Sequence, residues 1–178
     1  MTTPINAKFR LTNQDGQAVT ELTYRGDWLV VLFGFTNCQV VCPRALSRLS
    51  SVLDSLDPAL TEQIRPLYVT VDPARDTPEV MKAFLQQNYP RFTGLTGTED
   101  QVEEAKEAFA IFARRKADPD APDGYVVPHT AISYLIDPKG QYATHWTAAV
   151  DAADFFPHRF FILGKEIQDQ LAAARWRA

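Results

Sequence analysis

Two cysteines are the residues of this chain whose type and spacing best suit a chemical role. Cys38 and Cys42 lie four residues apart, directly after the apolar run Trp28–Phe35. Pro43 suits the first turn of a helix, so we expect Cys42 at a helix start. One helical turn rises about 5.4 Å and disulfide-linked Cα atoms lie about 4.4 to 6.8 Å apart, so the pair can form a reversible disulfide. The free amides of a helix start also favour the thiolate, which is both a nucleophile and a metal ligand.

The small number of cysteines also favours a site. Two cysteines cannot stabilise a domain of this length in the way that several disulfides stabilise small secreted domains. The alternative interpretation is a pair of inert core cysteines. Core cysteines seldom pair at a turn between a strand and a helix, so their position favours a chemical role for both.

The elements predicted around the cysteines alternate between strands and helices. The run Trp28–Phe35 is continuously apolar, which is typical of a strand buried on both faces of a parallel sheet. Leucines recur at helical spacing between Pro43 and Leu56, and Asp15-Gly16 between two extended runs predicts an opening hairpin. Over the whole chain we expect strands at 9–11, 18–22, 28–35, 67–71, 92–95, 131–136 and 141–146, and helices that begin near residues 43, 78 and 98 or run over 151–174.

This order of elements indicates the fold class. The helix from residue 98 is expected to carry Phe109 and Phe112 on its apolar face and to end in the basic run 114–116, before a loop at 118–124. A strand, a two-cysteine turn, a helix and then a distal hairpin with a closing helix is the order expected of a thioredoxin-like domain. We therefore predict one α/β domain over residues 1–178, with a thioredoxin-like central sheet flanked by helices and an N-terminal β-hairpin extension.

A metal at the cysteines would need further ligands, and the chain has three histidines. His129 precedes the predicted strand 131–136, where the loop of a thioredoxin-like sheet faces the cysteine turn. His145 lies in the partner strand and His158 in the last predicted helix, where histidine is more often a surface or core residue. The topology favours His129 as the third ligand. Two sulfurs and one imidazole suit Cu(I), whereas structural zinc normally takes four protein ligands.

Several strings of the sequence resemble the Sco/SenC family of copper metallochaperones. They are 33–38 (FGFTNC), Cys42-Pro43, 69–78 (VTVDPARDTP), 90–98 (PRFTGLTGT) and His129. The resemblance implies that Cys38, Cys42 and His129 bind one copper ion. It also implies a thioredoxin-like fold, a role in maturing the copper centre of cytochrome c oxidase, and room for thiol reductase activity.

The resemblance carries expectations about partners and location. It implies a cytochrome c oxidase subunit or another thiol protein as the partner of the copper-loaded chain. It implies a periplasmic location with the N-terminal membrane anchor that most members carry, although that anchor is absent from this chain and a cytoplasmic location stays open. The sequence leaves the oligomeric state open.

The chain departs from the family pattern at two places beside the candidate ligands. Gln39-Val40 stands where members usually have Pro-Asp, and Pro128 stands where an Asp usually precedes the ligand His129. Those carboxylates could orient the imidazole or offer oxygen to Cu(II), so their absence favours thiol chemistry. A cis Val127–Pro128 bond would also favour disulfide exchange with an extended substrate, whereas a trans proline would merely start the strand.

Two other functions remain as alternatives to copper binding. A thiol-disulfide oxidoreductase needs only the pair, with Cys38 as attacker and Cys42 as resolver. A peroxidase of the peroxiredoxin kind is disfavoured, because its usual Thr lies three residues before the cysteine and Thr36 lies two before. Asp72, Arg75 and Asp76 are interpreted as organisers of a loop and are left out of the candidate site.

Composition and charge exclude several classes of protein. The chain is 46% apolar and 22% charged, which is typical of globular domains and excludes a disordered one. Its net charge of −4 and the lack of a basic stripe exclude a nucleic-acid role. The longest uncharged apolar stretch is far shorter than the roughly 20 residues that span a bilayer, and polar threonines follow Met1. We therefore expect neither a membrane span nor a signal peptide in this chain.

Overall fold

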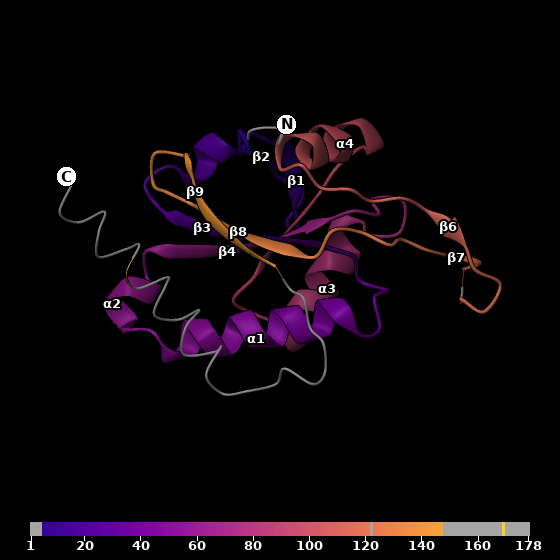
Figure 1. Ribbon diagram of the computed structural model, residues 1–178, viewed down its shortest axis with the longest axis horizontal. Helices are drawn as coiled ribbons and strands as arrows, with labels where there is room; N and C mark the ends of the chain where they lie inside the picture. Colours follow the sequence, from indigo (N-terminus) through magenta and orange to yellow (C-terminus); the bar gives the residue numbers. More distant parts are fainter. Residues whose placement is uncertain (1–4, 122, 148–168, 170–178) are drawn as a thin grey trace.

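The computed structural model describes residues 5–121, 123–147 and 169 of the 178. The centre of the molecule is a seven-stranded mixed sheet with the strand order β2-β1-β5-β4-β3-β8-β9 (Figure 1). The strands of this sheet are β1 (Arg10–Asn13), β2 (Ala18–Thr20), β3 (Trp28–Gly34), β4 (Ile64–Thr70), β5 (Thr93–Thr96), β8 (Ile132–Ile136) and β9 (Tyr142–Thr147).

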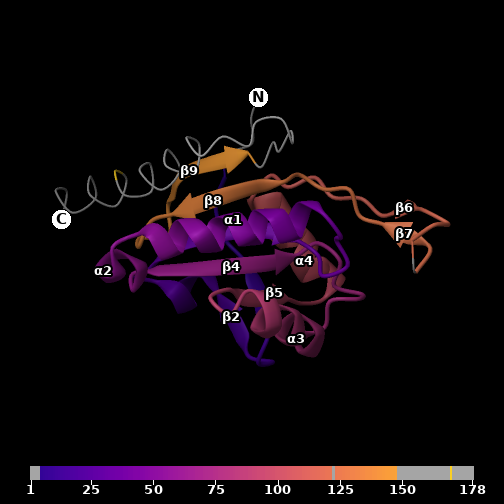
Figure 2. The ribbon, with the colours of Figure 1, turned by 90° about the horizontal axis from the view of Figure 1, so that it is seen from below.

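Helices cover both faces of this sheet, as the sequence predicted. Figures 1 and 2 show α1 and α3 on one face and α4 on the other. A two-stranded ribbon of β6 and β7 projects from one end of the sheet in both views. The remaining elements are η1 (Glu21–Tyr24), α1 (Val41–Ser55), α2 (Pro58–Thr61), α3 (Pro78–Asn88), α4 (Glu99–Ala108), β6 (Lys116–Ala117) and β7 (Tyr125–Val126).

Strand β3 lies inside the core, as its continuous apolar sequence predicted. Every residue of β3 is buried, and the strand pairs in parallel with β4 and antiparallel with β8. On one face of the sheet the Phe33 and Phe109 ring centroids lie 5.2 Å apart, and those of Phe109 and Tyr134 lie 5.3 Å apart. Large apolar side chains from strands and helices therefore close around β3 and hold its carboxyl end in place.

The strand directions bring three segments to one edge of the sheet. Because β3 and β4 are parallel, their last residues, Gly34 and Thr70, are register partners. Because β8 is antiparallel to β3, the chain enters β8 at the same edge. The segment after β3 carries the cysteines, the segment after β4 carries Asp72–Asp76, and the segment before β8 carries His129.

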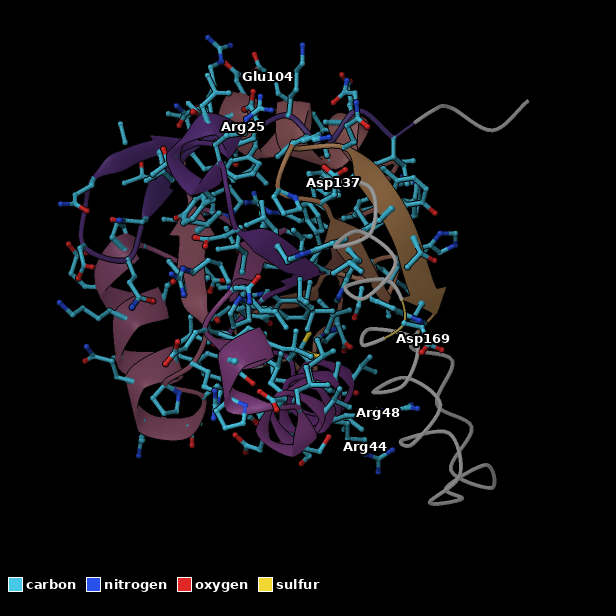
Figure 3. All side chains as sticks on the ribbon, turned by 90° about the vertical axis from the view of Figure 1, so that its left-hand side faces the viewer. Arg25, Arg44, Arg48, Glu104, Asp137 and Asp169 are labelled. Atoms are coloured by element: carbon cyan, nitrogen blue, oxygen red, sulfur yellow. The ribbon has the colours of Figure 1, made fainter. Side chains whose placement is uncertain are left out.

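The opposite edge of the sheet is closed by a contact between two turns. The Gly26 amide donates to the Pro138 carbonyl at 3.0 Å, and the Arg25 guanidinium donates to the Lys139 carbonyl. Figure 3 shows Arg25 and Asp137 near each other on this side of the molecule. This end binds the loop before β3 to the β8–β9 turn and lies away from the cysteines.

Strand β4 begins earlier than the sequence predicted. It starts at Ile64 and contains Pro66, a residue that argues against a strand interior because it lacks an amide donor. Strand β5 pairs only with Leu67–Val69, so Pro66 lies beyond the part of β4 that has a hydrogen-bonded neighbour on both sides. The sequence also missed the short helix α2, which Asp57 caps by accepting from the Ala59 amide.

The expectation that one helix continues through Phe112 is wrong. Helix α4 ends at Ala108, and Ala110 has φ 53°, in the left-handed region that ends a helix. Phe112 is 67% exposed instead of packed on the sheet. The basic residues expected at the helix end instead lead into β6, which begins at Lys116.

The first and last predicted elements have different outcomes. The N-terminal hairpin is confirmed, with Gly16 at its turn at φ 77°, which glycine adopts without strain. Strand β1 of the hairpin also pairs with β5, so the hairpin extends the main sheet. The closing helix predicted at 151–174 lies outside the described residues except for Asp169.

Among the described residues, no helix is long and apolar enough to cross a membrane.

Candidate metal centre

The turn after β3 places Cys38 over the first turn of α1. The helix begins at Val41, and its N-cap residue Val40 makes no side-chain hydrogen bond to the helix amides. The Cys38 sulfur takes that place and accepts from the Cys42 amide at 3.3 Å. The Cys38 amide in turn donates to the Phe35 carbonyl at 3.2 Å. The prediction that the second cysteine lies at a helix start is confirmed.

The two thiols differ in their tendency to ionise. A hydrogen bond from the Cys42 side chain, helped by backbone amides of the first helical turn, lowers the pKa of Cys38 to about 5. The same hydrogen bond and burial raise the pKa of Cys42. Cys38 is half-buried, whereas Cys42 is only 3% exposed. Cys38 therefore carries the thiolate and Cys42 keeps its proton, which it shares with the Cys38 sulfur.

His129 approaches the cysteines from the segment before β8. Its ring meets the Phe35 ring edge-on, with centroids 5.7 Å apart. Nδ1 lies 3.0 Å from the Val127 carbonyl oxygen, which can only accept, so Nδ1 carries the proton. The lone pair of Nε2 is then free, and Nε2 lies 3.9 Å from the Cys42 sulfur. This tautomer is the one that can bind a metal through Nε2.

The other two histidines are not brought to the cysteines within the described part of the chain. His145 lies in β9 opposite Tyr134, and its Nδ1 contacts the Tyr142 hydroxyl. His158 lies outside the described residues. The described residues contain no cis peptide bond, so Val127–Pro128 is trans, and Pro128 lies between β7 and β8 instead of starting a strand.

The side chains of the candidate site do not form a complete metal site in this structure. No group of three or more His, Cys, Asp or Glu side chains among the described residues stands in a position to hold a metal ion. Cys42 and His129 already face each other, and both are anchored, Cys42 by burial and His129 through Nδ1. A metal would therefore be bound after a movement of Cys38, which is half-buried and lies in the turn before the helix.

Asp76 holds the start of the cysteine turn. Its carboxylate accepts from the Thr36 amide at 3.1 Å, from the Thr36 hydroxyl at 2.5 Å and from the Thr70 hydroxyl at 2.6 Å. Burial raises the pKa of this carboxyl, and these three donors oppose the rise. Since Thr36 lies two residues before Cys38, the role that the sequence suggested for Asp76, an organiser of a loop, extends to the cysteine turn.

A second carboxylate, Asp72, organises the segment that leads to His129. Asp72 is fully buried and accepts from Arg75 at 2.5 Å, from Arg115 at 3.2 Å and from the Tyr125 hydroxyl at 3.1 Å. The Arg75 guanidinium also lies over the Tyr125 ring, 4.0 Å from its centroid. Tyr125 is four residues before His129, so this cluster, which we call the Asp72 cluster, connects the β6–β7 ribbon to the edge of the sheet.

The ribbon also contacts the cysteine turn directly. The Asp123 carboxylate accepts from the Asn37 side-chain amide at 3.1 Å and from Arg75 at 3.2 Å. Asn37 precedes Cys38, so Asp123 supplies a carboxylate near the site although Gln39-Val40 and Pro128 lack the family's acids. The sequence analysis missed this residue, because it lies 86 residues from Asn37 in a polar loop with no distinguishing pattern.

Comparison with known proteins identifies the family. The sequence matches the SCO1/SenC family over residues 1–157. The chain belongs to this family. The human protein SCO1 homolog, mitochondrial, is 34% identical over 143 residues, which are 80% of this chain and 47% of the relative. The chain thus spans about half the length of that curated relative.

Solved structures of Sco proteins share this fold. Arabidopsis thaliana ScoI, solved with copper bound, gives a TM-score of 0.79 at 26% identity and covers 93% of this chain and 99% of its own. BsSco, a member of the Sco family of cytochrome c oxidase assembly proteins in which a disulfide switch was identified, gives a TM-score of 0.67 at 25% identity over 96% of each chain. The predicted thioredoxin-like fold and the Sco/SenC resemblance are confirmed.

Proposed function

We propose that this Sco protein is a copper metallochaperone that binds one copper ion through Cys38, Cys42 and His129. The observation that carries the proposal is the 3.9 Å approach of His129 Nε2 to the Cys42 sulfur, with the Nε2 lone pair left free by the contact of Nδ1 with Val127. Copper is the cargo of the protein. The copper bound to Arabidopsis ScoI supports the same cargo here.

The ligand set favours Cu(I) as the bound form. Two soft sulfurs and one imidazole suit Cu(I), which accepts three ligands. Cys38 needs little free energy to lose its proton, because its pKa is already lowered to about 5. Copper displaces the proton of Cys42, and the movement of Cys38 then closes a trigonal site.

A Cu(I) titration tests the ligand set. The reduced full chain is titrated with Cu(I) without oxygen, against a colorimetric Cu(I) chelator, to give stoichiometry and affinity. We expect one Cu(I) per chain and at least about a tenfold loss of affinity in His129→Ala. His145→Ala is the matched control, because His145 is exposed on β9 and lies against Tyr142. Equal losses in the two variants would overturn the assignment of His129.

We propose that the partner is a cytochrome c oxidase subunit or another thiol protein. We also propose that the two proteins interact in the periplasm. Membership of BsSco in a family of oxidase assembly proteins supports the first. Mixing the Cu(I)-loaded chain with a purified copper-free oxidase subunit, and following copper in each protein after separation, tests the transfer. Copper that stays on this chain while the subunit accepts copper from a small chelate would argue against delivery.

Thiol-disulfide exchange is a second candidate function, favoured by the contrast between the two thiols. The half-buried Cys38 thiolate would attack a substrate disulfide and release one substrate thiolate, which leaves a mixed disulfide. Cys42 would then attack the Cys38 sulfur, lose its proton and release the second substrate thiol. The substrate gains two electrons, and this chain ends with a Cys38–Cys42 disulfide.

Trapping the mixed disulfide tests this second function. Cys42→Ser should accumulate a stable mixed disulfide with a model peptide disulfide, because the resolving thiol is gone. Cys38→Ser should accumulate none, since Cys42 is buried. Mass spectrometry of the two variants distinguishes the outcomes, and similar adducts on both would contradict the assigned roles.

A further inference from the structure

Tyr68 is a buried hydroxyl beside the candidate metal centre that neither proposed function uses. It lies in β4 between Leu67 and Val69 and is fully buried. Its hydroxyl donates to the Phe35 carbonyl at 3.1 Å, at the start of the cysteine turn. The ring stacks on Phe84 at 6.1 Å between centroids, which fixes the direction of the hydroxyl. A buried tyrosine hydroxyl needs a partner, and this one finds it where the site begins.

Gly34 brings the Tyr68 hydroxyl and the Cys42 sulfur to the same place. A Cβ at Gly34 would fall 2.4 Å from the hydroxyl oxygen and 2.8 Å from the sulfur, so both atoms occupy the space that a side chain would take. The hydroxyl lies beside the sulfur and acts to lower the pKa of Cys42, against the larger rise that Cys38 and burial cause. Gly34 has no positive φ, so its role at this position is steric.

The Tyr68 hydroxyl has one proton and two acceptors within reach. In the structure the Phe35 carbonyl takes the hydrogen bond. A sulfur that has lost its proton to copper, or shares it with Cys38, is the stronger acceptor because hydrogen bonds to charged groups are roughly twice as strong as neutral ones. The packed ring keeps the hydroxyl oxygen beside both acceptors. A rotation of the hydroxyl hydrogen is therefore enough to move the hydrogen bond from the Phe35 carbonyl to the Cys42 sulfur.

We propose that Tyr68 is a positioning residue of the site, whose hydroxyl donates a hydrogen bond to the Cys42 sulfur and stabilises its reduced and copper-bound states. The sulfur of a disulfide carries little charge and gains less from such a donor. Loss of the hydroxyl therefore favours the Cys38–Cys42 disulfide over the dithiol. The copper arm of this inference rests on the proposed function, whereas the redox arm depends only on the cysteine pair.

The reduction potential of Tyr68→Phe tests the redox arm without copper. In a dithiothreitol redox buffer at pH 7 the pair follows disulfide + 2 e⁻ + H⁺ ⇌ Cys38 thiolate + Cys42 thiol, with dithiothreitol as the reductant. We expect the equilibrium constant for reduction to fall about tenfold, which is about 30 mV toward more negative potential. Trapping with iodoacetamide, followed by mass spectrometry, gives the ratio of disulfide to dithiol at each buffer potential. A potential equal to that of the parent would overturn the proposal.

Tyr134→Phe is the matched control for a merely structural role. The Tyr134 hydroxyl is also buried and donates to a backbone carbonyl, that of Phe109, at 2.8 Å. Both substitutions remove one buried hydroxyl and its hydrogen bond to a backbone carbonyl, and the Phe35 carbonyl keeps the Cys38 amide as a donor, so Tyr134→Phe should destabilise the fold at least as much as Tyr68→Phe. Only Tyr68→Phe should move the potential. Equal shifts in the two variants would assign the effect to packing and overturn the proposal.

The copper arm uses the absorption of the Cu(II)-loaded chain. Removing a donor raises the energy of the sulfur electrons, so the sulfur-to-copper charge-transfer band should move to lower energy in Tyr68→Phe and stay in place in Tyr134→Phe. An unmoved band in both variants would contradict this arm. A chain that binds no copper while Tyr68→Phe still moves the potential would reject the proposed function and leave the Tyr68 inference standing.

Discussion

The cysteine turn and the segment that carries His129 meet at the same edge of the sheet, but different interactions hold them there. The turn is a local structure, in which the Cys38 sulfur caps the helix that begins three residues later. His129 lies 87 residues from Cys42 and reaches it through a segment held by the Asp72 cluster. We therefore expect thiol chemistry to depend on the short-range geometry of the turn, and metal binding through His129 to depend also on the buried charge of Asp72.

Breaking the Asp72 cluster should have the largest effect. Asp72→Asn removes the buried charge that Arg75 and Arg115 share and leaves each cation with one more exposed partner, Asp123 for Arg75 and Glu99 for Arg115. We expect a loss of about 3 kcal/mol in the free energy of unfolding, measured by urea denaturation. In the folded protein, Cu(I) affinity should fall while the alkylation rate of Cys38 stays near that of the parent.

Glu104→Gln is a control for the general loss of an acidic ion-pair partner. Glu104 pairs with Arg10 on an exposed surface of α4, marked in Figure 3, where such pairs contribute about 0 to 1 kcal/mol. It should change neither stability nor copper affinity measurably. If Asp72→Asn altered Cys38 reactivity as strongly as copper affinity, the two regions would not be independent.

Filling the space at Gly34 should have the next largest effect, and it should act on the cysteine turn. Gly34→Ala places a methyl group into the Tyr68 hydroxyl and the Cys42 sulfur, and overpacking of this kind costs about 1 to 3 kcal/mol. We expect the displaced sulfur to weaken Cu(I) binding and to slow disulfide formation, as measured by thiol trapping.

Gly94→Ala is the matched control for Gly34→Ala. A Cβ at Gly94 would fall 2.9 Å from a Leu85 methyl group and 3.1 Å from the Met81 Cβ, in the core and away from the sulfurs. It should destabilise the fold and leave the rate of disulfide formation unchanged. Slower disulfide formation in both variants would assign the effect to stability alone.

The pH dependence of Cys38 alkylation tests the cysteine side of the comparison, and the effect we expect from it is the smallest. Because the pKa of Cys38 is lowered to about 5, its thiolate is fully formed above about pH 6, and its alkylation rate should be flat from about pH 6.5 to 8.5. In Cys42→Ala the main donor is lost, so the pKa should rise and the rate should increase with pH over this range. A rising rate in the parent protein would contradict the lowered pKa.

Much of this architecture was predictable from the sequence because its signals are local. The apolar run of β3, the Asp15-Gly16 turn and the Pro43 helix start each depend on neighbouring residues, and all three are confirmed. The end of α4 was not predictable in this way, since Phe112 continues the apolar pattern and only the backbone at Ala110 ends the helix.

The sequence by itself determined the cysteine pair, its place between a strand and a helix, and His129 as the favoured histidine, because spacing and element order carry that information. The tertiary structure alone decided that Tyr68, Gly34 and the Asp72 cluster belong around these residues. Their contacts arise from parallel pairing of β3 with β4 and from the return of the chain into β8, which bring distant segments to one edge. The physical reason is that a hydrogen bond or ion pair depends on distance in space, which strand pairing sets and sequence separation does not.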